Sequence, residues 1–158
     1  MKQLRGFGVI EILIVSAVLS ASIASLYSAF AIAHKASVFA SDRTRANFLV
    51  EEGIEVMRFL RDKSWNANLA SLNTNTGYYI SFDQLLSRWS VSVSPTSLID
   101  NKFKRIITLD AVMRNANDDI VFSGGTVDTN SYKVISIVTW GNNGTTSAET
   151  YLSDIFDN

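Results

Sequence analysis

The feature that most constrains this chain is a run of 22 uncharged residues, Ile12 to Ala33, rich in isoleucine, leucine, valine and alanine. As an α-helix rising ~1.5 Å per residue, the run is about 33 Å long, enough to cross the hydrocarbon core of a membrane. Lys2 and Arg5 precede it, and basic residues favour the cytoplasmic side. We therefore expect a single-pass helix with a cytoplasmic N-terminus, and export of everything after His34.

One charged residue, Glu11, lies at the start of this run, and no other charge occurs between Gly6 and Ala33. A carboxylate at the centre of a membrane costs roughly 2.5 to 3.5 kcal/mol on insertion scales, and less near the interface. A conventional secretory signal has its cleavage site after the apolar core, whereas here Gly6 and Phe7 come before it. Glu11 is therefore a candidate functional residue that needs a partner.

The short basic leader joins the apolar run through the stretch from Gly6 to Glu11, which reads Gly-Phe-Gly-Val-Ile-Glu. This order resembles the class III signal of type IV prepilins and type II secretion pseudopilins. The resemblance implies a leader of residues 1–6, cleavage between Gly6 and Phe7 by prepilin peptidase, and N-methylation of Phe7 by the same enzyme. It also implies three further partners: other pilins or pseudopilins, an inner-membrane assembly platform and membrane lipid.

The implied cleavage would create a partner for Glu11. The new amine of Phe7 is cationic, and Glu11 of one subunit can meet the amine of a neighbour in a helix bundle. Opposite charges ~4 Å apart attract by about 4 kcal/mol at an effective dielectric near 20, before desolvation is subtracted. Such a pair would set the register of assembly. Two other interpretations stay open: an ordinary anchor with an incidental glutamate, and a signal peptide cut after Ala33, where Ala31-Ile32-Ala33 has the small-x-small form.

A row of small residues follows the apolar run at four-residue spacing: Ala17, Ala21, Ser25 and Ala29. Small faces let helices approach closely in membranes, so the row predicts helix packing, although alanine and serine are also common in spanning helices. Many major pilins carry a glycine and a proline in this span. Ser20 and Ser28 stand there instead, which favours a minor pilin.

An amphipathic helix is expected over residues 35–64, where apolar residues recur with a 3.6-residue period. They are Phe39, Ala46, Leu49, Val50, Gly53, Ile54, Met57 and Leu60. The other face is charged, and we expect Arg58 to meet both Glu55 and Asp62. The end of this helix also resembles a subset of minor pilins, in which Gly53 would permit close helix–sheet contact and Trp65 would cap the core.

The remaining residues predict a β-rich head. Residues 65–77 are polar and are expected to form a loop, the segment Asp83 to Trp89 is ambiguous, and Gly141-Asn142-Asn143-Gly144 is typical of a hairpin turn. Strands are expected at Tyr78–Phe82, Phe103–Val112, Ile120–Phe122, Tyr132–Trp140 and Thr145–Leu152. The predicted fold is α+β: a long N-terminal helix, transmembrane over residues 7–34, packed on a C-terminal antiparallel sheet within residues 78–158 of an exported head, 35–158. The family resemblance implies the same fold.

Composition excludes several functions. The chain has 158 residues, no cysteine and one histidine, His34. Disulfides, thiol catalysis, triad-type hydrolysis and multi-histidine metal sites are therefore not available. The net charge of −1 gives no basic excess for nucleic acid. Asp118, Asp119 and Asp128 lack the spacing of a calcium loop, so turn roles are expected instead.

The expected function is a structural subunit of a type IV pilus-like filament, most like a minor pilin, with no catalytic activity, cofactor or metal. A pseudopilin of a type II secretion system is the alternative within the same family. A membrane-anchored exported binding domain that never polymerises is the alternative outside it, and an enzyme on a membrane stalk is the least favoured.

Overall fold

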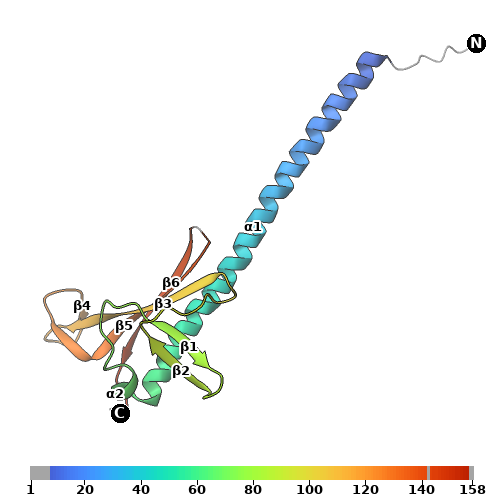
Figure 1. The fold of residues 1–158 in the computed structure, drawn as a ribbon. Helices are drawn as coiled ribbons and strands as arrows, with labels where there is room; N and C mark the ends of the chain where they lie inside the picture. The colour runs from blue at the N-terminus through green and yellow to red at the C-terminus, as the bar shows by residue number, and fades with distance from the viewer. Residues whose placement is uncertain (1–7, 142, 157–158) are drawn as a thin grey trace, which may run out of the picture. The chain divides into compact units, whose positions relative to one another are not determined.

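The computed structural model describes residues 8–141 and 143–156, and its elements are shown in Figure 1. Two helices come first, α1 (Val9–Lys63) and α2 (Trp65–Asn68). Six strands follow: β1 (Tyr79–Asp83), β2 (Arg88–Ser92), β3 (Phe103–Arg114), β4 (Ile120–Val121), β5 (Thr126–Trp140) and β6 (Gly144–Ser153). The chain divides after Ser41 into two compact units, and α1 contributes to both.

α1 is a single helix of 55 residues that contains no proline, the residue that most often breaks a helix. It ends at Lys63 because Ser64 takes an extended backbone and caps the next helix, where its hydroxyl accepts a hydrogen bond from the Ala67 N–H at 3.2 Å. Residues 65–77, expected as a loop, therefore begin with α2. The serine at the cap position is the local signal for this short helix.

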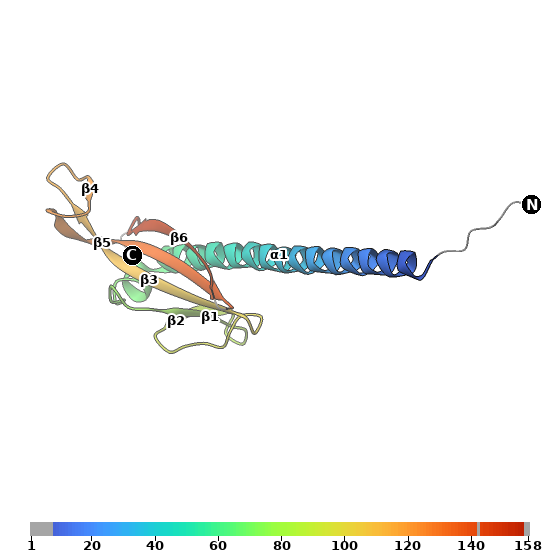
Figure 2. The same cartoon turned by 90° about the horizontal axis from the view of Figure 1, so that it is seen from above.

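The strands of the head form two antiparallel sheets rather than the single expected one. The larger sheet has the order β4-β3-β5-β6, and β1 and β2 form a separate hairpin. Tyr78 bridges to Ile107 of β3, so the hairpin lies on the β3 side of the larger sheet, away from β6 (Figure 2). All five predicted strands are present, β5 and β6 pair as predicted, and the ambiguous segment Asp83 to Trp89 forms the end of β1, the hairpin turn and the start of β2.

β5 contains a bulge that was not predicted from the sequence. Ala111 of β3 pairs with Tyr132, but the next residue, Val112, pairs with Asp128, so residues 129–131 are extra on the β5 side. The Asp128 carboxylate accepts the Asn130 N–H at 2.9 Å, which holds the bulge. β5 therefore begins at Thr126, well before the regular alternation that predicted a strand from Tyr132.

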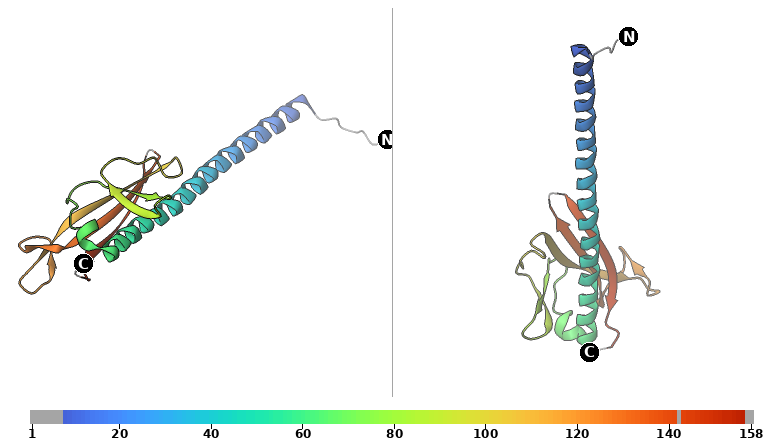
Figure 3. Two further views of the ribbon diagram at one scale, coloured as in Figure 1. Left: turned by 60° about the horizontal axis from the view of Figure 1, so that its bottom comes forward. Right: turned by 90° about the vertical axis from the view of Figure 1, so that its right-hand side faces the viewer.

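The core of the head lies between the larger sheet and the second part of α1 (Figure 3). The buried residues of α1 are Ala46, Leu49, Val50, Gly53, Ile54, Val56, Met57 and Leu60. This is the predicted stripe with Val56 added and Phe39 missing. Phe39 is 52% exposed because it belongs to the first unit, before the segment that covers the sheet. Trp65 is buried and stacks on Tyr132, with ring centroids 5.4 Å apart, as expected for a residue that caps the core.

The charged face of α1 was predicted only in part. Glu55 and Arg58 form the expected ion pair. The expected pair of Arg58 with Asp62 is wrong, because Asp62 instead binds the neighbouring Arg61 at 2.8 Å. The Arg58–Glu55 pair is largely solvated, so it adds little to stability.

Candidate functional site

The first unit of the described chain presents an apolar helical surface that nothing covers. The large apolar side chains of α1 from Val9 to Ile32 are exposed. No residue of the most apolar 18-residue stretch of this helix is buried. By length and composition this part of α1 is able to cross a membrane. Contiguous exposed apolar surface of this extent marks a membrane or a protein partner.

Glu11 lies in the first turn of this helix, and its carboxylate already has one local partner. Its Oε2 accepts the Gly8 N–H at 3.0 Å, so a residue in the first turn satisfies the N–H of the cap position. The positive end of the helix dipole also favours a carboxylate here. The cost of carrying Glu11 into an apolar environment is therefore smaller than for an unpartnered acid. Sequence reasoning missed this contact, although a glutamate three residues after a glycine cap was the available signal.

The predicted cleavage and methylation site, Gly6 and Phe7, lies outside the described residues. The described chain begins one residue later, at Gly8. Both assignments therefore stay predictions.

The row of small residues lies along an exposed ridge of the helix: Ala17, Ala21, Ser25 and Ala29. Residues four apart drift by about 40° per step around an ideal helix, so the row forms an inclined ridge of the kind that packs into the groove of another helix. A second helix is needed to test this role, so helix packing also stays a prediction.

Four serine hydroxyls in the apolar segment are satisfied within the helix. Ser20 Oγ donates to the Ser16 carbonyl at 2.7 Å, and Ser25 Oγ donates to the Ala21 carbonyl at 2.9 Å. Ser16 and Ser22 make the same kind of bond one turn back, to the carbonyls of Leu13 and Val18. These serines therefore need no partner from another chain or from water.

In the second unit, one loop and one strand hold the part of α1 that begins at Asp42, called the head segment of α1 below. The three polar contacts that do this are Asp42 with Lys102, Arg45 with Asp100 at 3.0 Å, and Asn47 with Thr146 at 2.8 Å. The first two join α1 to the loop before β3, and the third joins it to β6. α1 is thus fixed to the head from Asp42 onward.

A buried cation lies between α1 and β3. The Arg105 side chain is 5% exposed, and its Nη1 donates to the Leu49 carbonyl at 3.0 Å and to Glu52 Oε2 at 2.8 Å. Arg105 Nε and the fully buried Ser136 Oγ have no hydrogen-bond partner in the described structure. Arg105 shares the buried side of β3 with Phe103, Ile107 and Leu109, and its partner on α1 was not predicted.

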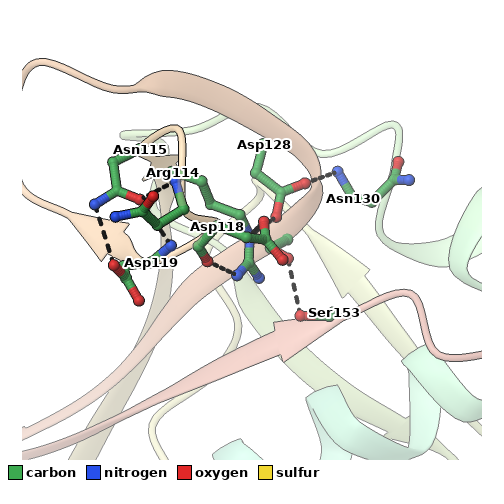
Figure 4. Close-up of polar contacts among 9 residues, drawn as sticks. Arg114, Asn115, Asp118, Asp119, Asp128, Asn130 and Ser153 are labelled. Carbon is green, nitrogen blue, oxygen red and sulfur yellow. Dashed lines mark hydrogen bonds and ion pairs between the residues drawn. The ribbon is translucent and has the colours of Figure 1, made fainter.

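Asp118 and Asp119 lie in the turn between β3 and β4, whereas Asp128 lies in β5 rather than in the expected loop, and all three have structural contacts near Arg114 (Figure 4). Arg114 Nε donates to Asp128 at 2.7 Å, and its Nη1 donates to the Asp118 carbonyl at 2.9 Å. The backbone N–H of Asp119 donates to the side chain of Asn115, and Asp118 has a positive φ of 67°, as turn residues do. Within residues 8–141 and 143–156, no group of three or more histidine, cysteine, aspartate or glutamate side chains is placed to hold a metal ion.

Acid is expected to weaken the head through Asp128. The hydrogen bond from Arg114 holds the pKa of the Asp128 carboxyl below its usual value. The stabilisation is therefore complete above the unfolded pKa of about 3.9 and is lost as the pH falls through the lower folded pKa. Asp128→Asn should flatten this acid slope, measured as the urea midpoint against pH by tryptophan fluorescence. Glu51→Gln, which removes an exposed carboxylate of α1, is the control; an unchanged slope in Asp128→Asn would contradict the assignment.

Comparison of the chain with protein-family models, with curated proteins and with solved structures returned no match. The functional argument therefore depends on the chain itself, and above all on an uncovered apolar helix that begins with a carboxylate.

Proposed function

We propose that the chain is a structural subunit of a type IV pilus-like filament, most like a minor pilin. In this proposal it is inserted in the inner membrane as a single-pass precursor, cut after Gly6, methylated at Phe7 and assembled through α1. The observation that carries the proposal is Glu11, a carboxylate in the first turn of a helix whose apolar side chains are exposed as far as Ile32.

Capping of the helix occupies one oxygen of this carboxylate, and an assembling helix can use the other. Oε2 of Glu11 holds the Gly8 N–H, and Oε1 has no recorded partner among the described residues. A carboxylate accepts several hydrogen bonds, so it can bind a neighbour's amine without giving up the bond to Gly8. In an apolar bundle this charge-assisted contact is stronger than in water, which gives assembly a preferred register.

The exposed small-residue ridge supplies the surface for such a bundle. Ser25 on the ridge and Ser20 beside it bond their own helix, so close approach of a second helix leaves these two hydroxyls satisfied. The head would then lie in an extracellular or periplasmic filament. Proposed partners are prepilin peptidase, the assembly platform, membrane lipid and other pilins, or pseudopilins if the machine is a type II secretion system.

The test is Glu11→Ala in the producing cell, with the amount of the chain in sheared or purified filaments compared with its amount in the membrane. Incorporation should fall at least about tenfold, because even half of the ~4 kcal/mol attraction exceeds a tenfold change in an equilibrium constant. Membrane level and mature mass should not change. Glu51→Ala, which removes an exposed glutamate of the head segment of α1, is the matched control.

Two results would overturn the proposal. One is normal filament incorporation of Glu11→Ala, which would leave a membrane-anchored binding domain as the better reading. The other is an intact mass showing that the mature chain begins at His34 rather than at an N-methylated Phe7.

A further inference from the structure

The larger sheet has an edge strand, β6, with one side that no described strand covers. β6 has ten residues and pairs with β5 along its whole length, from Ser153 to Gly144, without a shift in register. Its other side is open, because β6 ends the strand order β4-β3-β5-β6, on the side of the sheet away from the β1–β2 hairpin (Figure 2). Backbone N–H and C=O groups form a regular row along such an edge. The open side of β6 is called the β6 edge below.

The opposite side of the same sheet is protected. β4, the other outermost strand, has only two residues. Beside it on β3, Ile107 exchanges two backbone hydrogen bonds with Tyr78, at 2.8 and 2.9 Å. The Leu109 carbonyl also accepts the Asn75 N–H at 2.9 Å. A very short strand and a covering segment are two of the means by which proteins prevent unwanted strand pairing, so the β6 edge differs from its counterpart.

The residues of β6 give its edge none of this protection. The strand contains no proline, lysine or arginine, and its pairing with β5 has no bulge. Its one charged residue, Glu149, is held back across the sheet, because its carboxylate pairs with Lys133 of β5 at 2.7 Å. Thr145, Ser147 and Tyr151, exposed on the same face, are neutral. The β6 edge is therefore long, regular and free of uncompensated charge.

The chemistry of the β6 edge selects an extended polypeptide as its partner. Donors and acceptors that repeat along a strand are matched by another extended backbone, and main-chain hydrogen bonds then supply the affinity. Every strand pair in the larger sheet is antiparallel, and this is also the more stable arrangement. An added strand would lie beside Thr146, Ala148 and Thr150 on one face and beside Ser147 on the other, so it would meet small or β-branched side chains.

A second copy of the chain does not supply such a strand if both copies are anchored in one membrane. The head segment of α1 runs in the same direction as β6, since Asn47 bonds Thr146 near the start of β6. Trp65, which follows α1, stacks on Tyr132, the cross-strand partner of Leu152 near the end of β6.

Antiparallel pairing of two β6 edges would therefore point the two head segments of α1 in opposite directions, whereas the proposed membrane insertion gives them the same direction. In a copy with the same orientation, the outermost strand of the larger sheet that runs against β6 is β4, and two residues are too few to cover the β6 edge.

We propose that the β6 edge binds an extended segment of a different polypeptide, which adds to the larger sheet as an antiparallel strand. Backbone hydrogen bonds supply the affinity, and the neutral side chains of β6 accept many sequences provided that the segment is extended. The inference does not depend on filament assembly. Only the exclusion of a second copy rests on the proposed membrane insertion.

The probe is an acetylated peptide with the sequence of residues 131–140, because this strand already pairs with β6 inside the head. The full-length ¹⁵N-labelled chain, held in a nonionic detergent, is titrated with the peptide, and amide hydrogen exchange is followed by NMR. Exchange at alternate amides of β6 should slow at least about tenfold at saturation, because a hydrogen-bonded amide exchanges only when the strand opens. Exchange in the centre of β3 should not change.

Two modified peptides test whether backbone pairing is responsible. Each carries N-methyl groups at alternate residues, one set on each edge of the extended peptide, so the two have the same composition. An added strand uses one of its edges, so one peptide should bind as the unmethylated peptide does. The other should bind at least about tenfold more weakly, because several backbone hydrogen bonds are lost.

The deciding variant of the chain is Ser147→Lys, which places a protecting lysine on β6 at an exposed position. It should bind the peptide several-fold more weakly. Thr139→Lys makes the same change in charge at an exposed position of β5, away from the edge, and should bind normally. Unshifted indole signals of the buried Trp65 and Trp140 in the free variants show that the head is folded.

Three results would overturn the proposal: no saturable protection of β6 by the unmethylated peptide, equal affinities of the two N-methylated peptides, or an unchanged affinity in Ser147→Lys. Protection of β6 that grows with the concentration of the chain alone, without peptide, would assign a second copy to the β6 edge and would equally overturn it.

Discussion

Replacing Glu52 with alanine is expected to lower the free energy of unfolding by about 3 kcal/mol, because it leaves the cation of Arg105 buried without a counter-charge. Arg105 cannot reach water, since its side chain is 5% exposed at the contact of α1 with β3. The Leu49 carbonyl would be its single remaining partner among the described residues, and a neutral carbonyl compensates a buried guanidinium poorly.

Replacing Arg105 with methionine should cost much less, within about 1 kcal/mol of the unmodified chain. Methionine fills most of the space of the arginine stem and removes an Nε that has no partner. The Glu52 side chain, 44% exposed, then returns to water without a large penalty. The two halves of one ion pair should thus have very unequal effects.

Urea unfolding of the full chain in detergent, followed by tryptophan fluorescence, measures both variants. Glu51→Ala is the control, because it removes a neighbouring glutamate that is exposed. If Arg105→Met were as destabilising as Glu52→Ala, the ion pair itself would stabilise the head. The expected difference between the two variants in the free energy of unfolding would then be wrong.

The second large effect is expected at Gly53, where a single methyl group should destabilise the head by about 2 kcal/mol. A Cβ built on Gly53 would lie 2.5 Å from Ser136 Oγ and 3.0 Å from Ile107 Cδ1. Alanine improves helix propensity by about 1 kcal/mol, so the clash must exceed this gain for the net change to be unfavourable. The close approach of α1 to the sheet was expected at Gly53. The structure shows that Ser136 and Ile107 are the residues that a side chain at this position would meet.

Ser136→Ala should rescue much of this loss. The change alone should be neutral or stabilising, because it removes a buried hydroxyl that has no partner in the described structure. It also removes the closest atom to the new methyl group, so the two changes should be strongly non-additive in a double-mutant cycle. Gly53→Ala/Thr139→Ala, with the second change on the exposed side of β5, should be additive. Additivity of Gly53→Ala with Ser136→Ala would show that the clash lies elsewhere.

Periodicity predicted the parts of the fold in which each residue type matches its environment. The stripe on α1 from Ala46 to Leu60 and the alternation of β3 were correct because apolar residues there are buried. The β1–β2 hairpin was not recognised because its turn contains Leu85, which is apolar yet 97% exposed. The bulge at residues 129–131 has no periodic signal, since it is held by the Asp128 carboxylate, which accepts the Asn130 N–H, and by the Asn130 carbonyl, which accepts the Asp154 N–H.

The sequence identified some residues of the candidate site but not their contacts. Glu11 was identified from its charge in an apolar run, but its bond to Gly8 depends on where the helix begins, which sequence patterns locate poorly. The pair Arg105–Glu52 was missed because 53 residues separate its members.

The serine hydroxyls that bond their own helix have a consequence for how such helices choose one another. A serine hydroxyl that is already satisfied offers no directional contact to a neighbour, so in the proposed assembly recognition beyond Glu11 would depend on shape, with large side chains of one helix fitting against small residues of the next. Packing selected by shape accepts a different chain whose small and large residues follow the same pattern. An assembly built from such helices would thus admit mixed membership, with the exposed heads, rather than the helices, setting subunits apart.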